Sequence, residues 1–340
     1  MTSALIFGMS GLDLTADERA FFREADPWGY IVFARNIADK AQLLRLTDRL
    51  REVSGRADVP ILIDQEGGRV ARLKEPVWRH PPPAAAFAGI YGRDVETAME
   101  AAFLNSRLIA AELREVGINV SCSPCIDLLH EEGHGIIGDR ALGSETNQIA
   151  ELGRAVAEGL LDGAVLPVVK HIPGHGRART DSHLELPEVA TAHEELSRTD
   201  FVPFRSLSDM PMAMTAHVVY SALDPERCAT LSSRVVHHVI RGEIGFDGLL
   251  MSDDVGMNAL SGGFDERTHR ALVAGCDVVL HCSGNMDEMQ ECLRGARKLD
   301  GEAARRAAAA LDRIAPPSDF DAGKGAARLA HLMAGGTAIA

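Results

Sequence analysis

Residues 146–171 read TNQIAELGRAVAEGLLDGAVLPVVKH, a stretch in which two hydrophobic patterns follow one another. The first part, Thr146–Leu161, is rich in Ala, Leu and Glu and stops near Gly163, as a helix does. The run Leu166–His171 comes next, and its apolar residues do not alternate with polar ones. Such a run is typical of a strand buried on both faces in a parallel sheet. The stretch therefore predicts a helix followed by a parallel strand.

The same two patterns recur along the rest of the chain. Further helices are expected at Thr97–Val116, at Ser232–Glu243 and from Thr191 to Leu207, where Thr191 and Glu194 form a T-x-x-E capping box. Short apolar runs rich in Val, Ile and Leu separate the helical stretches. The eight runs are Ala4–Met9, Tyr30–Ala34, Pro60–Asp64, Ile118–Cys122, Leu166–His171, Met212–His217, Leu249–Asp253 and Val278–His281.

Eight alternating strand–helix units predict an α/β fold, a single (β/α)₈ TIM-type barrel over residues 1–300. An open doubly wound sheet is the competing arrangement, but no Gly-x-Gly-x-x-Gly follows the first run. Lys74–Ile90, which contains three consecutive prolines, is expected to be a long loop. Residues 301–340 begin with an Ala/Arg-rich helix and continue past Pro316–Pro317 into a Gly-containing tail. They predict a short C-terminal helical appendage that packs on the barrel or trails from it.

The composition and charge argue against several classes of partner. The chain has 340 residues and a formal net charge of −14, without a cluster of Lys and Arg. Nucleic acid and an anionic membrane are therefore not expected as partners. No apolar run approaches the roughly 20 residues of a membrane span. The first twelve residues lack the basic start of a secretory signal. We expect a cytoplasmic protein, a monomer or weak homodimer.

The six cysteines are scattered through the chain, which does not resemble a secreted disulfide framework. Cys122 and Cys125 form one CxxC, but a zinc site would need a second pair at suitable spacing. Structural or incidental thiols are the favoured interpretation. A redox or metal role for this pair is the alternative.

Charged and imidazole side chains follow many of the predicted strands. Barrel enzymes carry their catalytic groups at the C-terminal ends of the strands, and the sequence places polar groups there. They are Asp64, Glu66 and Arg69 after the third run, Asp127 after the fourth, Lys170 and His171 at the fifth, His217 at the sixth, Asp253 and Asp254 at the seventh, and His281 at the eighth. Some have structural alternatives: His217 as a core histidine, and Asp254 as a helix cap.

The most informative stretch is KHIPGHGRARTDSH, residues 170–183. Within it Asp181 lies two positions before His183, and a nearby carboxylate holds an imidazole in one tautomer and raises its basicity. His171 and His175 have the i, i+4 spacing of a helical zinc site, but Pro173 and two glycines interrupt any helix. We therefore predict proton transfer at Asp181 and His183, and no metal or other cofactor.

These residues resemble those of the glycoside hydrolase family 3 β-N-acetylglucosaminidases of the bacterial NagZ type. KHIPGHG followed by DSH is the most specific part of the resemblance, which runs from about residue 5 to about residue 300. The other matching segments are IDQEGGRVARL around Asp64, IIGDRALG around Arg140, MTAHVVYSALDP around His217 and GFDGLLMSDDVGM around Asp253.

The resemblance implies a retaining hydrolysis of terminal β-linked GlcNAc through a covalent glycosyl-enzyme. Asp253 matches the nucleophile, and His183 matches the general acid/base, with Asp181 as its polarising partner. The residues that match or lie within sugar-binding segments are Asp64, Arg72, Arg140, Lys170, His171 and His217. A neutral imidazole as acid/base departs from the usual pair of carboxylates, yet it still passes a proton.

Three other functions compete with this hypothesis. The first is a β-N-acetylglucosaminide phosphorylase, because a neutral imidazole tolerates an incoming phosphate better than a carboxylate does. The second is a non-catalytic amino-sugar-binding barrel. The third is a metal-dependent aldolase or hydrolase. The family and the expected cytoplasmic location together imply peptidoglycan recycling, with GlcNAc linked β-1,4 to 1,6-anhydro-MurNAc as the substrate.

Overall fold

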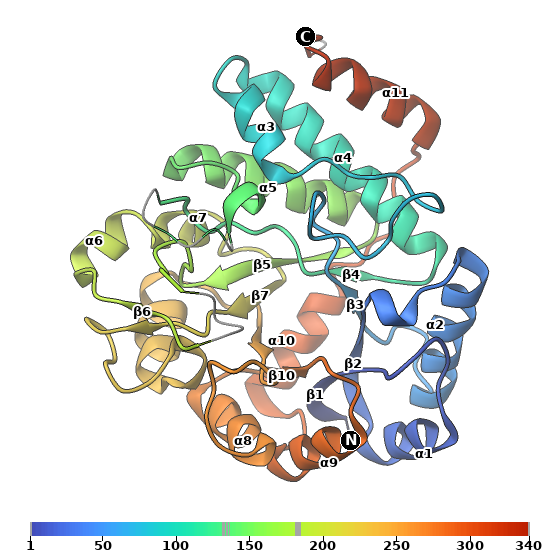
Figure 1. Ribbon diagram of the computed structural model, residues 1–340, viewed down its shortest axis with the longest axis vertical. Coiled ribbons are helices and arrows are strands. Elements are labelled where there is room, and N and C mark those ends of the chain that lie inside the picture. The colour runs from blue at the N-terminus through green and yellow to red at the C-terminus, as the bar shows by residue number, and fades with distance from the viewer. Residues whose placement is uncertain (1, 131–132, 134, 136, 181–184, 339–340) are drawn as a thin grey trace.

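The computed structural model describes residues 2–130, 133, 135, 137–180 and 185–338. Eight parallel strands close into a barrel in the order β1, β10, β9, β7, β5, β4, β3, β2, with helices around it (Figure 1). The barrel strands are β1 (Ser3–Gly8), β2 (Pro27–Val32), β3 (Ile61–Ile63), β4 (Val120–Ser121), β5 (Leu166–Ile172), β7 (Met212–Thr215), β9 (Leu249–Asp254) and β10 (Val278–His281). The predicted barrel is confirmed, and the open doubly wound sheet is excluded.

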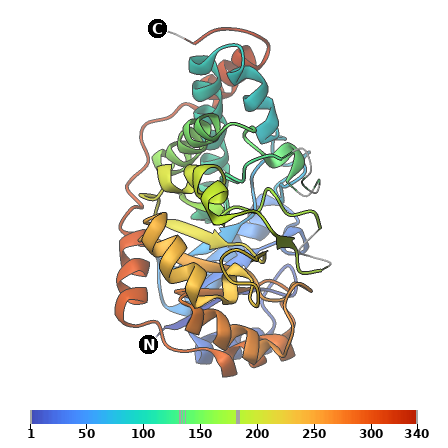
Figure 2. The same cartoon turned by 90° about the vertical axis from the view of Figure 1, so that its left-hand side faces the viewer.

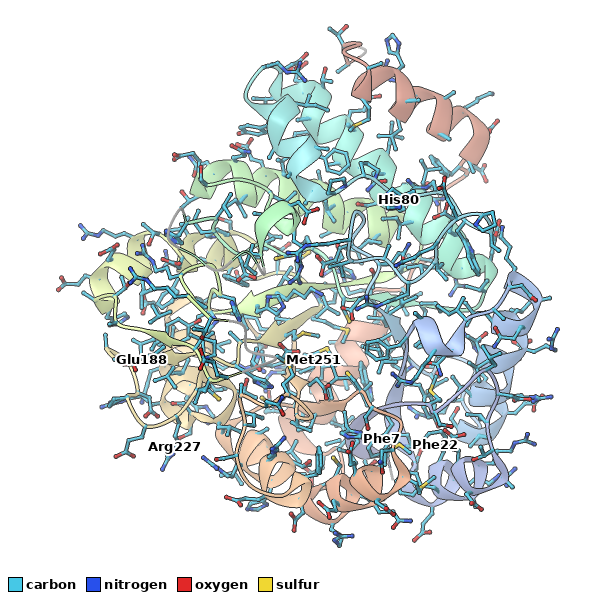
Figure 3. All side chains as sticks on the ribbon, viewed as in Figure 1. Phe7, Phe22, His80, Glu188, Arg227 and Met251 are labelled. Atoms are coloured by element: carbon cyan, nitrogen blue, oxygen red, sulfur yellow. The ribbon has the colours of Figure 1, made fainter. Side chains whose placement is uncertain are left out.

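Burial on both faces explains the unbroken apolar runs. Every residue of β1, β2 and β5 is buried, since one face looks into the barrel and the other toward the helices. Phe7 of β1 pairs in register with Tyr30 of β2 and His281 of β10, which closes the sheet. Phe7 and Phe22 lie side by side in Figure 3, and their rings stack at a centroid distance of 6.3 Å. Aromatic side chains thus join the barrel to its first helix.

Helices follow most of the barrel strands. They are α1 (Ala16–Ala25), α2 (Lys40–Ser54), α3 (Ala84–Tyr91), α4 (Val95–Glu115), α5 (Thr146–Asp162), α6 (His193–Arg198), α7 (Phe201–Ser206), the π-helical η4 (Val235–Glu243), α8 (Phe264–Ala274), α9 (Met286–Gly295), α10 (Gly301–Leu311) and α11 (Ala322–Met333). Short 3₁₀ turns form η1 (Ala34–Asn36), η2 (Gly138–Arg140) and η3 (Ala229–Leu231). A separate parallel pair joins β6 (Glu188–Val189) to β8 (Val219–Tyr220).

The stretch from Thr191 to Leu207 differs from its prediction. The N-cap of α6 is Ala192, which makes no side-chain capping bond, so the capping box of Thr191 and Glu194 is wrong. The stretch also forms two short helices, α6 and α7, instead of one. The helix is interrupted because Pro203 has no N–H to bond the Thr199 carbonyl and its ring clashes with that carbonyl. The side chains of Thr199 and Asp200, at the break, bind Arg177.

Two other segments differ in detail from their predictions. The expected loop Lys74–Ile90 runs into α3, because the Ala-rich residues after Pro83 bury Phe87 and Ile90 against the helical layer. The helix expected at Ser232–Glu243 is present, but Val235–Glu243 is π-helical. The wider helical turn arises from i to i+5 hydrogen bonds, which sequence periodicity does not distinguish from i to i+4 bonds.

The residues after 300 form two helices on different parts of the molecule. Lys298 and Leu299 pair with Ser3 and Thr2, so α10 starts at the N-terminal end of β1. The chain then runs along one edge of the molecule to α11, which packs against α4 (Figure 2). Both guanidinium donors of Arg328 in α11 reach the Glu100 carboxylate at 2.7 Å. The appendage is therefore packed, while its boundary at residue 300 stays a prediction.

Among the described residues, no helix combines the length and the apolar character needed to cross a membrane.

Candidate active site

The C-terminal ends of the barrel strands surround a cavity of about 370 Å³. This end of a (β/α)₈ barrel is where its enzymes carry the active site. Apolar contacts from Phe33, Met214 and Met257 form part of the cavity wall. The predicted site residues that line it are Asp64, Arg72, Arg140, Lys170, His171 and Asp253. Strand closure therefore brings together residues that lie far apart in the sequence.

Lys170 lies at the centre of the charged wall. Its ammonium group is 3.0 Å from an Asp64 oxygen and 2.6 Å from a Glu66 oxygen, and its side chain is only 3% exposed. Arg72 reaches the other Asp64 oxygen at 3.2 Å. Burial raises the pKa of Asp64, but the attraction of Lys170 and Arg72 outweighs it, so the net pKa is lowered. Burial likewise lowers the pKa of Lys170, and Asp64 and Glu66 reverse this effect. All of these groups stay charged near neutral pH.

Glu66 is a site residue that the sequence placed at a strand end but to which it gave no role. Its carboxylate accepts two hydrogen bonds from Arg140, at 2.8 and 2.9 Å, as well as the bond from Lys170. Burial raises the pKa of Glu66, but the two cations hold it well below its usual range. Two-point binding of this kind fixes the orientation of the guanidinium. Glu66 therefore positions Arg140 and Lys170 together. Its place two residues after Asp64, at a strand end, was the available signal.

Asp127 positions His171, as Glu66 positions Arg140 and Lys170. One of its oxygens lies 2.6 Å from His171 Nδ1, and the other accepts the backbone N–H of His175 at 2.6 Å. The carboxylate is fully buried. Burial raises its pKa, but the nearby imidazoles and the backbone donor lower it well below its usual range. An ionised Asp127 holds the proton on Nδ1 of His171, so that Nε2 is left as the hydrogen-bonding atom for a ligand.

Asp253 is the penultimate residue of β9 and lies at the edge of the cavity. Burial raises its pKa, yet His217, His171 and the backbone N–H of Asp254 outweigh this effect, and the pKa is lowered. The side chain is therefore an anion near neutral pH. The neighbouring Asp254 has a structural role. Its Oδ1 accepts hydrogen bonds from the backbone N–H groups of Gly256 at 2.9 Å and Cys282 at 3.1 Å. Asp254 ties together the chain after β9 and β10 and caps no helix.

His217 is buried, and both of its ring nitrogens have protein partners. Nδ1 lies 2.7 Å from the Thr230 hydroxyl, and Nε2 lies 3.0 Å from the backbone carbonyl of Asp254. This arrangement supports the segment that carries the Asp253 carboxylate. Contact between His217 and a substrate stays a prediction. Asp181 and His183, the predicted acid/base pair, lie outside the described residues.

Within the described part of the chain, one cluster has donors of the kind that hold a metal: Cys125, Asp127 and His171. Its donor atoms all lie within 4.8 Å of one another and are buried. They are already hydrogen-bonded among themselves, since the Cys125 thiol lies 3.3 Å from the Asp127 oxygen that bonds His171. Burial raises the pKa of Cys125 far above its ordinary value, so the group is a thiol and a weak metal ligand.

We expect removal of metal ions to leave activity unchanged. The donors of this cluster satisfy one another without an ion, and Lys170 pairs with the carboxylates of Asp64 and Glu66. The measurement is turnover of a β-GlcNAc aryl glycoside before and after chelation and desalting. Loss of turnover that zinc restores would contradict this expectation.

The sequence of this chain is similar to sequences of known proteins. Residues 13–315 match the glycosyl hydrolase family 3 N terminal domain. A beta-hexosaminidase of Alkalilimnicola ehrlichii is 40% identical over 286 residues, covering 82% of this chain and 80% of the relative. A beta-hexosaminidase of Pseudomonas aeruginosa is 36% identical over 323 residues, covering 94% and 90%.

The likeness extends to three dimensions. The crystal structure of NagZ from Neisseria gonorrhoeae in complex with N-trifluoroacetyl-D-glucosamine superposes with a TM-score of 0.88 at 30% identity, covering 98% of each chain. The family match, residues 13–315, contains every predicted site residue and all barrel strands except β1. The chain is therefore a glycoside hydrolase that belongs to glycosyl hydrolase family 3 and has the activity class of the beta-hexosaminidases.

Proposed function

We propose that this enzyme is a retaining β-N-acetylhexosaminidase that removes terminal β-linked GlcNAc through a covalent intermediate on Asp253. The proposal rests on one observation: Asp253 lines the same cavity as Asp64, Arg140, Lys170 and His171. An anionic nucleophile beside a dense array of charged hydrogen-bonding groups is the arrangement that a polar sugar ring requires.

The charged wall binds and orients the sugar. Asp64 accepts hydrogen bonds from sugar hydroxyls, and Arg140 and Lys170 donate to the ring substituents and the acetamido oxygen. Nε2 of His171 accepts a hydrogen bond from a sugar hydroxyl. Because Glu66 and Asp127 already hold these groups in place, little side-chain entropy is lost on binding. A fixed sugar then presents its anomeric carbon to Asp253.

The reaction has two displacement steps at the anomeric carbon. In the first, an Asp253 oxygen forms a bond to that carbon while the bond to the leaving oxygen breaks, and His183 gives its proton to the leaving oxygen. In the second, water gives a proton to His183 and attacks the same carbon, which releases Asp253. Asp181 holds the imidazole in the required tautomer. Two inversions retain the β configuration.

The proposed natural substrate is GlcNAc linked β-1,4 to 1,6-anhydro-MurNAc, and the proposed setting is the recycling of cell-wall fragments in the cytoplasm. The relative from Neisseria gonorrhoeae that holds N-trifluoroacetyl-D-glucosamine supports an N-acylated amino sugar in this cavity. The bacterial beta-hexosaminidases among the relatives support the same class of sugar.

A panel of chromogenic aryl glycosides tests the proposal. We expect the β-GlcNAc glycoside to exceed the β-glucoside in kcat/KM by about 10- to 100-fold, since a buried donor left without its acetamido partner costs about 1–3 kcal/mol. The β-glucoside is the matched control, because it differs only at the 2-substituent. Equal kcat/KM values for the two substrates would reject the acetamido requirement.

A further inference from the structure

The segment from residue 174 to residue 189 joins β5 to β6 and contains the predicted acid/base pair. At its first end, the backbone of Gly174 has a φ of +136° and packs so closely on Asp200 that a Cβ would lie 3.1 Å from the Asp200 Cβ. The Tyr220 hydroxyl donates a hydrogen bond to the Gly174 carbonyl at 2.6 Å. This end of the segment therefore contacts Asp200 and Tyr220, two buried residues that do not line the sugar cavity.

Asp200 joins three parts of the chain. Its carboxylate accepts a 2.7 Å bond from Arg177 Nε and a 2.7 Å bond from the Thr199 hydroxyl, and lies 3.1 Å from His130 Nε2. Its side chain is 1% exposed. Burial raises the pKa of Asp200, but these hydrogen bonds outweigh it and lower the pKa, so the group is ionised. Because both oxygens of this buried carboxylate have hydrogen-bond partners, Asp200 holds the three parts of the chain together. We call this arrangement the Asp200 junction.

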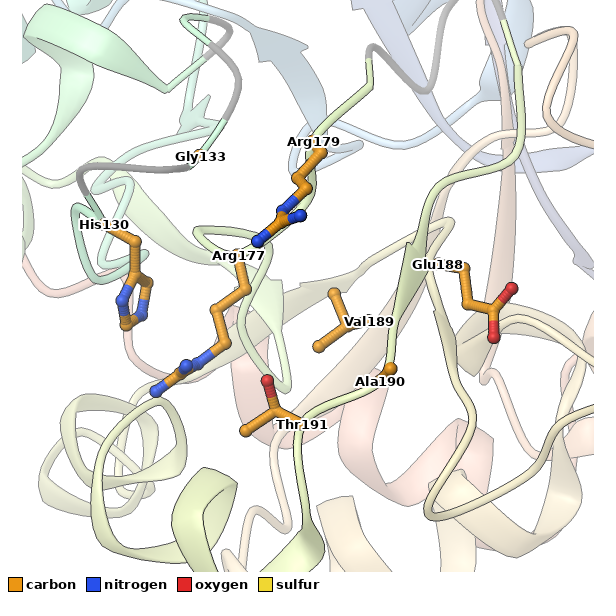
Figure 4. Close-up of a pocket in the computed structure, with 8 residues that line it drawn as sticks. All are labelled: His130, Gly133, Arg177, Arg179, Glu188, Val189, Ala190 and Thr191. Carbon is orange, nitrogen blue, oxygen red and sulfur yellow. The ribbon is translucent and has the colours of Figure 1, made fainter.

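Figure 4 shows where this junction lies. The His130 ring and the Arg177 guanidinium converge on one side of a cavity of about 580 Å³, which Val189 and Thr191 border on another side. The two ends of the segment thus face each other across this cavity. Arg177 also lies 2.9 Å from Glu195, so its guanidinium is held by α6 as well.

The second end of the segment is paired to the same support. β6 pairs with β8 in parallel, with Val189 opposite Tyr220. The backbone N–H of Val219 bonds the Pro187 carbonyl at 2.9 Å, and that of Ser221 bonds the Val189 carbonyl at 3.1 Å. Tyr220 therefore touches both ends: its hydroxyl bonds Gly174, and its backbone lies in the pair with β6.

We propose that Asp200, together with Tyr220, is a positioning residue for catalysis: Asp200 holds the first end of the 174–189 segment through Gly174 and Arg177, Tyr220 ties that end to β6, and the two together set where the acid/base group of the segment meets the leaving oxygen. The inference rests on the proposed function, because it takes His183 as that group. Asp200 acts through Arg177 and Gly174 and has no contact with the sugar.

The test is the leaving-group dependence of Asp200→Asn. The amide is neutral and has one acceptor oxygen instead of two, so it no longer holds the Arg177 guanidinium by a charge-assisted hydrogen bond. We expect kcat to fall about 10- to 100-fold on a β-GlcNAc disaccharide, whose departure needs a proton. On an activated aryl β-GlcNAc substrate we expect a loss below about threefold, with KM on both within about threefold, since binding groups are untouched.

The control is Asp209→Asn, the same change close after α7. Asp209 pairs with Arg154 and is 58% exposed, so its variant should keep wild-type kinetics on both substrates. If circular dichroism shows that Asp200→Asn does not fold, Arg177→Gln becomes the test variant. It removes the hydrogen bond from Arg177 to Asp200 and leaves the bonds of Asp200 to His130 and Thr199 in place.

Each outcome separates the inference from the proposed function. Equal losses on the two substrates, a loss confined to KM, or wild-type kinetics in the deciding variant would overturn the positioning role. A wild-type enzyme that cleaves neither β-GlcNAc substrate would instead overturn the proposed function.

Discussion

Asp253→Ala is expected to lower kcat on β-GlcNAc substrates by about 10⁴-fold or more, a loss of the size seen when a covalent nucleophile is removed. The carboxylate lies at the cavity edge and its pKa is lowered, so in the wild type it is ionised and ready to attack. Folding should be retained, because Asp253 is partly exposed at a strand end and Asp254 still closes the turn after β9. Initial rates and circular dichroism together measure this result.

Asp254→Asn serves as the control for that experiment. The amide keeps an Oδ1 acceptor for the backbone N–H groups of Gly256 and Cys282, so the loss in kcat should be far smaller than that of Asp253→Ala. A slow fluorinated sugar followed by mass spectrometry should label Asp253. A label on Asp254 would mean that the nucleophile is misassigned.

Lys170→Met should produce the largest loss of stability among the site variants, about 3 kcal/mol in the free energy of unfolding. The ammonium group is the shared partner of Asp64 and Glu66, and its removal leaves two carboxylates close together in a nearly water-free wall. Arg72 and Arg140 keep part of the compensation, which places the expected loss at the lower end for a broken buried pair. Urea unfolding at pH 7 measures it.

Lys40→Met is the matched control for this variant. Lys40 pairs with Glu115, but the two side chains are 48% and 56% exposed, so the change should stay within about 0.5 kcal/mol. A loss for Lys170→Met no larger than that of Lys40→Met would mean that the buried cluster adds little to stability.

The pH dependence of the Lys170→Met effect follows from the lowered pKa values of Asp64 and Glu66. A carboxylate with a lowered pKa in the folded state stabilises the protein above its unfolded pKa of about 4, and this contribution is lost as the pH falls toward the folded value. The difference between wild type and Lys170→Met should therefore be largest near neutral pH. It should shrink as the pH is lowered below about 4, which unfolding at several pH values would reveal.

Local pattern was a good guide to the barrel and to the strand-end groups that line its cavity. Each barrel strand is a short apolar run that needs no information beyond itself, and its position in a parallel sheet follows from burial on both faces. Because all strands of such a barrel point the same way, the residues that end them must meet at one rim. For that reason Asp64, Lys170, His171 and Asp253 could be grouped before any coordinates were known, and the cavity contains all four.

The sequence placed Glu66 and Asp127 at strand ends, but local pattern could not show which partners they hold. Glu66 bonds Arg140 across 74 positions, and Asp127 bonds His171 across 44. The break between α6 and α7, by contrast, had a local signal, because Pro203 cannot continue a helix through Thr199. The hydrophobic periodicity, the buried runs and the chemical type of the strand-end residues could all be read from the sequence, because they depend on neighbours along the chain. Which charge faces which could be read only from the folded barrel, because pairing in a buried wall depends on how distant segments come within hydrogen-bond distance.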